Sequence, residues 1–451
     1  MMRRLILCAA LIAADSALAN PYEKTLANGL RVIVKEDHRA PTVVHMVWYR
    51  AGSMDEFNGT TGVAHLLEHM MFKGTKRLKP GEFSKRVAEA GGRDNAFTSQ
   101  DYTAYFQQVP NASLSAMMAL EADRMAGLSI DPKEFSQEIK VVMEERRLRT
   151  DDQPHALVYE KLMAAAFQAH PYRRPIIGWM NDLENMTATD ARDWYRRWYV
   201  PNNAYVVVVG DVNKDEVFRL AERHYGKIGS RSLPGRKPQR EPAQVGAKRI
   251  VVKAPAQQPY LAMAWKVPAL RDVDKEREPY ALEVLAAVLD GHDAARYSRN
   301  LVRGSKIAVS AGAGYDAAVR GEALFVVDGT PSEGKSATEL EAALRAEIER
   351  IKKEGVSAEE LERVKIQAVA SQVYKRDSMM AQAMEIGRTE AVGLHWRDIG
   401  KMLENIRGVT AEEVQAVAGK YFDDAALTVA VLDPQPLAET APKAAAAGMR
   451  H

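Results

Sequence analysis

Cysteine is almost absent from this sequence: the only one among its 451 residues is Cys8. Cys8 lies in an N-terminal segment that we expect to be cleaved, which leaves the mature chain with no thiol and no disulfide. Long apolar runs are equally scarce. The run over residues 5–14 is too short to span a bilayer, and no later run is long enough. The sequence therefore excludes a disulfide framework and predicts no membrane span.

An excess of one charge is also missing, because 62 Lys and Arg residues face 60 Asp and Glu residues. The formal net charge of +2 gives no sign of the basic surface that binds nucleic acid. Hydrophobic residues at 46% and charged residues at 27% form an ordinary globular balance. A chain of this length exceeds one hydrophobic core, so we expect two or more domains and no nucleic-acid partner.

The first 19 residues have the pattern of a secretory signal peptide. Arg3 and Arg4 precede the short apolar run, and Ala17 and Ala19 form a small-residue cleavage site. We predict cleavage after Ala19. For an exported, cysteine-free chain of this size we predict a periplasmic location.

The chain is organised around one short motif, His65-Leu66-Leu67-Glu68-His69. Two histidines four residues apart on a helix lie on one face, one turn apart, so both imidazoles can reach one metal ion. From the same helix Glu68 can point at a water on the open side of that metal. This H-x-x-E-H order is the reverse of the common H-E-x-x-H zinc motif. It predicts a zinc site that needs one further ligand.

A later predicted helix offers candidates for that ligand, since catalytic zinc usually takes three protein ligands and a water. Glu138 and Glu145 are two helical turns apart and share a face, whereas Glu144 falls elsewhere on the helix. Apolar neighbours place this helix partly in the core, where two carboxylates need a positive partner. A zinc ion near Glu145 would be that partner. The alternative is a solvated acidic face.

The order of the predicted elements repeats along the chain. Residues 187–209 run from a capped helix to a buried strand, and residues 410–432 repeat that order and chemistry. Between the copies, residues 226–248 contain three prolines and several basic residues, which is typical of an exposed linker.

We therefore predict an α+β fold of two homologous domains from an internal duplication, each a mostly antiparallel sheet packed with helices. The expected ranges are a signal peptide at 1–19, an N-terminal zinc-binding domain at 20–225, the linker at 226–248, a related C-terminal domain without a metal site at 249–433, and a disordered tail at 434–451.

Over nearly the whole mature chain, the sequence resembles the pitrilysin, insulinase and mitochondrial processing peptidase family of zinc metallopeptidases. The resemblance rests on GTTGVAHLLEHMMFKGT, GGRDNAFTSQDYTAY, EIKVVMEERR, HPYRRPIIG and YVPNNAYVVVVGDV. It implies one zinc ion per chain, held by His65, His69 and Glu145, with Glu68 as the general base. Glu138 matches a glutamate that supports the family's zinc site, and the seven-residue spacing favours Glu145 over Glu144.

The resemblance also implies a function: a zinc endopeptidase that cleaves peptides or small unfolded proteins. A strand at the edge of the family's active site pairs with the substrate as an extra β-strand, and it is matched here by Asn95, Ala96, Phe97 and Thr98. The alternative is a non-catalytic scaffold or binding subunit of the same fold. The complete metal and base set favours the enzyme.

The second half lacks one part that family members acting alone possess. In those members the C-terminal domain supplies an arginine and a tyrosine that stabilise the tetrahedral intermediate. Arg303 fits the arginine position, but the tyrosine position falls on Val309 or Ser310, and Tyr315 comes a few residues too late. We therefore expect the catalytic subunit of a two-chain enzyme, with a related zinc-free partner supplying the Arg and Tyr oxyanion donors. A homodimer that uses other donors is the alternative.

Overall fold

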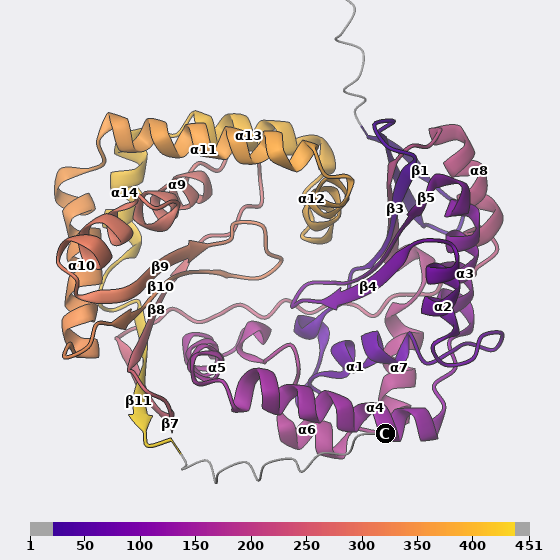
Figure 1. Ribbon diagram of the computed structural model, residues 1–451, viewed down its shortest axis with the longest axis horizontal. Coiled ribbons are helices and arrows are strands. Elements are labelled where there is room, and N and C mark those ends of the chain that lie inside the picture. Colours follow the sequence, from indigo (N-terminus) through magenta and orange to yellow (C-terminus); the bar gives the residue numbers. More distant parts are fainter. Residues whose placement is uncertain (1–20, 438–451) are drawn as a thin grey trace, which may run out of the picture. The chain divides into compact units, whose positions relative to one another are not determined.

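The structure, a computed structural model, describes residues 21–437 (Figure 1). The predicted signal peptide lies outside the described residues, as do residues 438–451 of the predicted tail. Within the described range, no helix has the length and apolar character needed to cross a membrane. The described chain divides into two compact units. Within the described residues, the first unit contains residues 21–142, 176–237 and 369–403. The second unit contains residues 143–175, 238–368 and 404–437.

The first unit is built on a six-stranded sheet in the order β1-β2-β6-β3-β5-β4. Neighbouring strands are antiparallel except β2 and β6, which run parallel. β4 is one edge of the sheet. The strands are β1 (Tyr22–Thr25), β2 (Arg31–Glu36), β3 (Thr42–Tyr49), β4 (Arg93–Thr98), β5 (Thr103–Pro110) and β6 (Ala204–Gly210).

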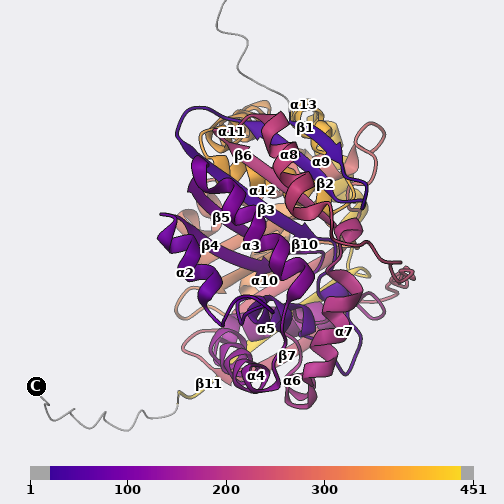
Figure 2. The same ribbon diagram turned by 90° about the vertical axis from the view of Figure 1, so that its right-hand side faces the viewer.

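Helices cover both faces of this sheet because side chains alternate along its strands. Figure 2 looks onto the face covered by α3 and α8. On the other face Val44, Met46 and Trp48 of β3 pack against Ala383 and Ile386 of α12. The helices of this unit are α1 (Val63–Met70), α2 (Glu82–Glu89), α3 (Leu114–Gly127), α6 (Met180–Asn185), α7 (Ala188–Trp198), α8 (Lys214–Tyr225) and α12 (Met379–Ala391), with the starts of α4 (Pro132–Arg146) and α13 (Ile399–Arg407).

Gly387 lets α12 approach the sheet closely. A Cβ atom added there would lie 2.1 Å from Cε2 of the buried Trp48 ring, and the Gly387 carbonyl accepts a hydrogen bond from the Tyr205 hydroxyl at 2.8 Å. We expect Gly387→Ala to lower the free energy of unfolding by about 1–3 kcal/mol, because the packed ring cannot yield without strain. Urea denaturation measures this effect. Gly400→Ala in α13 is the matched control, since its Cβ meets no atom within 4 Å. Equal stability of the two variants would contradict the prediction.

The second unit repeats the first with a five-stranded sheet in the order β7-β11-β8-β10-β9. This order matches β2-β6-β3-β5-β4, and its parallel pair, β7 and β11, occupies the matching place. The strands are β7 (Lys248–Pro255), β8 (Tyr260–Val267), β9 (Ala308–Tyr315), β10 (Ala323–Pro331) and β11 (Leu427–Gln435). The predicted α+β fold of two duplicated domains is therefore confirmed.

The helices of the second unit also follow the repeat. Thr187 and Thr410 both cap their helices with a reciprocal bond to the acid three residues later, as the sequence predicted. The helices are α5 (Pro154–Ala166), α9 (Glu278–Asp290), α10 (Ala337–Glu354) and α14 (Ala411–Tyr421), and α11 (Ala358–Arg376) begins in this unit and ends in the first.

Two helices pack on the sheet of the other half of the chain. Val158 and Leu162 of α5 join the core of the second sheet, although α5 falls in the range predicted for the N-terminal domain. In the same way α12 covers the first sheet from within the range predicted for the C-terminal domain. Apolar spacing shows that a helix is amphipathic, but it does not show which sheet its apolar face meets. β11 also continues through Pro434 and Gln435, which we expected in the tail.

The segment between α8 and β7 has no helix or strand, yet specific side chains fix it. In the first unit Arg236 donates to Asp55 at 2.8 Å and stacks on the Trp198 ring. In the second unit Glu241 accepts the backbone N–H groups of residues 168–170 at 2.6–2.9 Å. Burial raises the pKa of Glu241, but these donors and Lys266 lower it to about 2. Most residues of this segment are exposed, and Arg236 and Glu241 fix it at two points.

Candidate metal centre

The N-terminus of helix α1 is held by a carboxylate from the loop that precedes the helix. Glu56 accepts the backbone N–H groups of Gly62 and Ala64, each at 2.9 Å. These bonds satisfy donors that the first turn leaves open. Leu66 and Leu67 are fully buried. The remaining face of α1 carries His65, Glu68 and His69.

Three predicted ligands converge. One nitrogen or oxygen atom from each of His65, His69 and Glu145 lies within 4.8 Å of the other two, and all three side chains are half-buried. The two imidazole rings of α1 have centroids 4.8 Å apart. Glu145 occupies the last turn of α4, the same continuous helix that carries Glu138. The donor set of two imidazoles and one carboxylate is one that catalytic zinc takes while keeping a fourth position open.

Glu138 supports this arrangement from behind His69. His69 Nδ1 donates to Glu138 Oε1 at 2.9 Å, which leaves Nε2 with its lone pair directed outward. Lys73 Nζ lies 2.5 Å from the other carboxylate oxygen. Burial raises the pKa of Glu138, but the bonds from His69 and Lys73 hold it below its ordinary value. The carboxylate thus fixes the tautomer that a metal ligand needs, and the residues present fit zinc.

Glu144 and Glu145 differ in their surroundings although they are adjacent. The Glu145 side chain is 15% exposed and pairs with Arg149 at 2.5 Å. The Glu144 side chain is 59% exposed and pairs with Arg147 at 3.0 Å. Only Glu145 belongs to the group with the two histidines. The structure therefore places the residue that the seven-residue spacing favoured beside the histidines.

The four predicted substrate-binding residues separate into two pairs. Ser99 and Tyr102 follow the last pair of the β4–β5 ladder, Thr98 and Thr103. Ser99 donates its backbone N–H to the Tyr102 carbonyl, so Ser99 and Tyr102 form a hydrogen-bonded pair. Bonded and non-bonded pairs alternate along an antiparallel ladder. Phe97, opposite Ala104, therefore bonds to β5, as does Asn95, opposite Phe106. Thr98 and Ala96 direct their backbone groups to the open edge of the sheet.

Side chains on β4 follow the same alternation. The Phe97 ring packs edge-on against Trp48, on the face that α12 covers. The Thr98 hydroxyl lies on the opposite face and donates to Glu68 Oε2 at 2.5 Å. Sequence reasoning missed this contact and the Lys73–Glu138 pair. Lys73 lies three residues beyond the end of α1 and pairs with a residue of α4, so helical spacing gave no signal for it.

In the second unit, the residues considered as oxyanion donors have other contacts. Arg303 lies in a π-helical segment (Tyr297–Gly304) and donates to the Asp293 carbonyl at 2.5 Å. Tyr315 donates its hydroxyl to the Pro268 carbonyl at 2.5 Å. Val309 and Ser310 are exposed on β9, at the edge of its sheet. The Tyr315 hydroxyl is therefore engaged in a contact with the main chain of its own unit.

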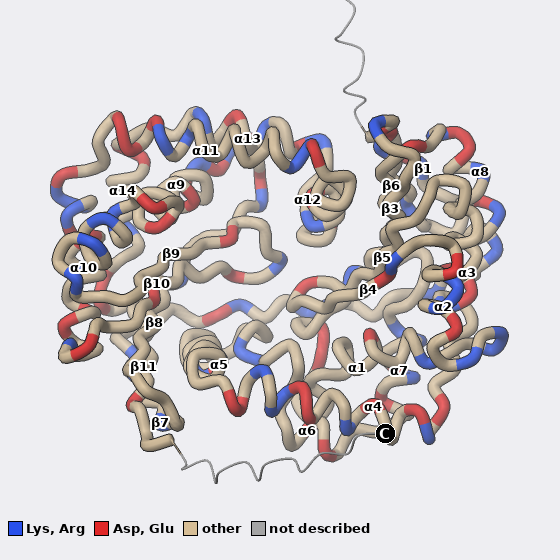
Figure 3. The backbone as a smooth tube through the Cα atoms, viewed as in Figure 1, with Lys and Arg blue, Asp and Glu red and all other residues tan. Residues whose placement is uncertain are grey.

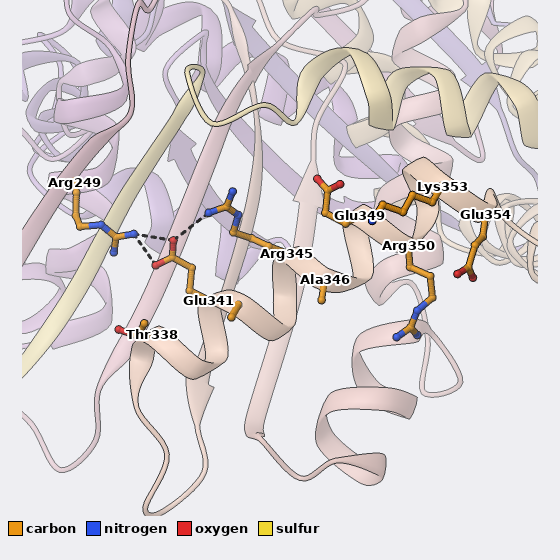
Figure 4. Close-up of a pocket in the computed structure, with 10 residues that line it drawn as sticks. Arg249, Thr338, Glu341, Arg345, Ala346, Glu349, Arg350, Lys353 and Glu354 are labelled. Carbon is orange, nitrogen blue, oxygen red and sulfur yellow. Dashed lines mark hydrogen bonds and ion pairs between the residues drawn. The ribbon is translucent and has the colours of Figure 1, made fainter.

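A recess along α10 contains none of the predicted residues. One of its lining residues, Glu341, accepts two bonds from Arg249 at 2.7 Å and pairs with Arg345 (Figure 4). Both Lys or Arg and Glu residues occur along α10 (Figure 3). The charges that line this recess are thus mixed, and Glu341 is paired with two arginines.

Two family models match the sequence in tandem. One, described as Insulinase (Peptidase family M16), matches residues 31–179, and the other, described as Peptidase M16 inactive domain, matches residues 185–368. The chain is also 35% identical to the zinc protease PqqE of Helicobacter pylori over 347 residues, which are 75% of this chain and 76% of the relative. The chain belongs to the M16 family of peptidases.

Solved structures agree with this assignment. A protease from Helicobacter pylori matches the M16 chain with a TM-score of 0.87 at 31% identity, covering 92% of this chain and 100% of that one. The periplasmic protease PqqL of Escherichia coli matches with a TM-score of 0.78 at 19% identity, covering 93% of this chain and 49% of that one. The second match shows the fold alone. The predicted family is confirmed, and its relatives include zinc proteases.

Proposed function

We propose that this M16 chain is a zinc-dependent endopeptidase that cleaves peptides or small unfolded proteins in the periplasm. One observation carries the proposal: His65 and His69 of α1 and Glu145 of α4 converge within 4.8 Å, with Glu68 on the same helix as the histidines. The family match described as inactive covers residues 185–368 and contains none of these four residues. That description therefore concerns the second half of the chain.

The chemistry follows from the residues around the proposed zinc. When bound, zinc lowers the pKa of a coordinated water to about 7 and polarises the scissile carbonyl. With His65, His69 and Glu145 holding zinc, Glu68 would act as the general base toward the attacking water and then as the general acid toward the leaving amine. Glu138 keeps His69 in the tautomer that presents Nε2. Thr98 holds one oxygen of Glu68 in place.

The open edge of β4 supports a preference for extended substrates. Thr98 presents its backbone N–H and C=O groups there and Ala96 its C=O group, while the Ala96 N–H donates to Asn95 Oδ1 at 2.9 Å, and a peptide strand can pair with the groups presented. Main-chain pairing selects chains that can become extended, so it favours flexible peptides over folded proteins. Main-chain pairing discriminates only weakly between substrate side chains.

A two-chain enzyme remains part of the proposal. Within the described residues Tyr315 is engaged with Pro268, and the tyrosine position of the family is filled by Val309 or Ser310. A related zinc-free subunit would supply the missing donor. A lost oxyanion donor costs about 10²–10³ in kcat, so the isolated chain should cleave slowly.

The test is hydrolysis of a quenched fluorescent peptide of unstructured sequence by the mature chain. We expect slow cleavage that stops with a chelator and returns with zinc, and a folded protein containing the same sequence should resist. A zinc-free homologous subunit co-purified from the native source should raise kcat by about 10²-fold or more. Full activity of the single chain would contradict the two-chain idea. Absence of chelator-sensitive cleavage with or without that subunit would favour a non-catalytic scaffold.

A further inference from the structure

The hydroxyl of Thr98 is bonded to the carboxylate that acts as base in the proposed function. Thr98 Oγ1 donates to Glu68 Oε2 at 2.5 Å, and the contact is partly buried. The last torsion of a glutamate is broad, so a bonded neighbour can select its orientation. We propose that Thr98 is a positioning residue that sets the orientation of the Glu68 carboxylate. This inference rests on the proposed function for its catalytic consequence.

Thr98 is suited to this task because its own position is well determined. Its β-branched side chain has few accessible rotamers, and its backbone stands opposite Thr103 in the β4–β5 ladder. The next residue, Ser99, is held from two sides: its N–H donates to the Tyr102 carbonyl at 2.9 Å, and its carbonyl accepts the Ser53 N–H at 3.1 Å. The hydroxyl therefore projects from a fixed point.

The same residue faces the open edge where a substrate strand would pair. The side chain of Thr98 reaches Glu68, while its backbone groups point along the plane of the sheet to the unpaired side. A peptide paired with Ala96 and Thr98 is thereby placed in a fixed register relative to the base. Thr98 thus links substrate docking to base orientation through one residue.

The test compares Thr98→Val with Thr98→Ser in the full chain. Thr98→Val keeps the branched shape and the backbone edge but removes the donor. We expect kcat to fall by about 10- to 100-fold, the usual effect of losing a partner that orients a catalytic group. KM and zinc content should stay within about twofold of wild type, because the docking edge and the ligands are intact. Thr98→Ser should restore most of kcat.

Thr103→Val is the matched control, since it removes the hydroxyl directly across the ladder, which donates to the Ala51 carbonyl. It should leave kcat within about twofold of wild type even if stability falls. An unchanged kcat in Thr98→Val, a loss confined to KM or zinc, or no rescue by Thr98→Ser would overturn the inference.

Crystal structures of wild type and Thr98→Val give a readout that needs no activity. The inference predicts one orientation of the Glu68 carboxylate in wild type and several in the variant. The same single orientation in both would refute it. If wild type cleaves no peptide, the proposed function fails, and this structural comparison still decides whether Thr98 positions Glu68.

Discussion

Glu68→Gln is expected to lower kcat for peptide hydrolysis by about 10²–10⁴-fold, the contribution of a positioned general base. Glutamine keeps the length of the side chain and an oxygen that accepts the Thr98 hydroxyl, so the local packing at this contact should survive. It cannot take a proton from water. Zinc content, measured by atomic emission, should remain that of wild type because Glu68 is not among the three converging donors.

The control for Glu68→Gln is the same substitution at Glu89 of α2, an exposed residue paired only weakly with Lys85. Glu89→Gln should leave both kcat and zinc content unchanged. Hydrolysis by Glu68→Gln within tenfold of wild type would show that another group takes the proton. Loss of zinc in that variant would instead show that Glu68 contributes to metal binding.

Glu145→Gln should weaken zinc binding by more than about 100-fold, the upper end of the loss seen when only an outer partner of a ligand is removed. The amide oxygen is a neutral and poorer donor to a divalent cation than a carboxylate. Competition against a chromophoric chelator measures the affinity directly. Glu138→Gln should fall between wild type and Glu145→Gln, because Glu138 acts on the metal through His69.

The neighbouring residue provides the control for this experiment. Glu144→Gln removes the same charge from the same helical turn, but its side chain is exposed and pairs with Arg147. We expect wild-type zinc affinity in Glu144→Gln. The reverse pattern, with zinc lost on changing Glu144 and retained on changing Glu145, would reject Glu145 as the third ligand.

The spacing of the proposed zinc ligands within each helix could be read from the sequence because a helix fixes its own geometry, whereas the choice of Glu145 as third ligand rested on the family resemblance as well. Four residues separate His65 from His69, and seven separate Glu138 from Glu145, so the faces follow from the helical repeat alone. The duplicated fold was predictable for the same reason, since a capped helix followed by a buried strand recurs after about 220 residues.

Contacts between distant elements could not be predicted in this way. Thr98 reaches Glu68 only because β4 packs beside α1, and its sequence neighbours give no sign of this. Likewise, Glu56 holds the start of α1 by accepting the N–H groups of Gly62 and Ala64, a contact that the sequence does not reveal. Helix α5 packs on the second sheet and helix α12 on the first, which reverses the halves of the chain that contain them. Packing between apolar faces decides this placement, and local periodicity does not reveal it.

The helix of the second copy that matches α1 differs from it in the residues that it carries. Helix α9 occupies the place of α1 in the repeat but contains no histidine, and Leu282, Leu285 and Leu289 are completely buried in it. Helix α1 also buries leucines, Leu66 and Leu67, but its other face carries the two imidazoles. One copy therefore carries the two histidines on this helix, and the other keeps the helix for core packing.

Anomalous diffraction at the zinc edge from crystals of the zinc-loaded chain tests the central claim most directly. The claim predicts one peak per chain, about 2.0–2.2 Å from a nitrogen of His65, a nitrogen of His69 and an oxygen of Glu145. The fourth position should be open to water and face Glu68. A peak at another cluster, or a zinc ion bound without Glu145, would contradict the claim.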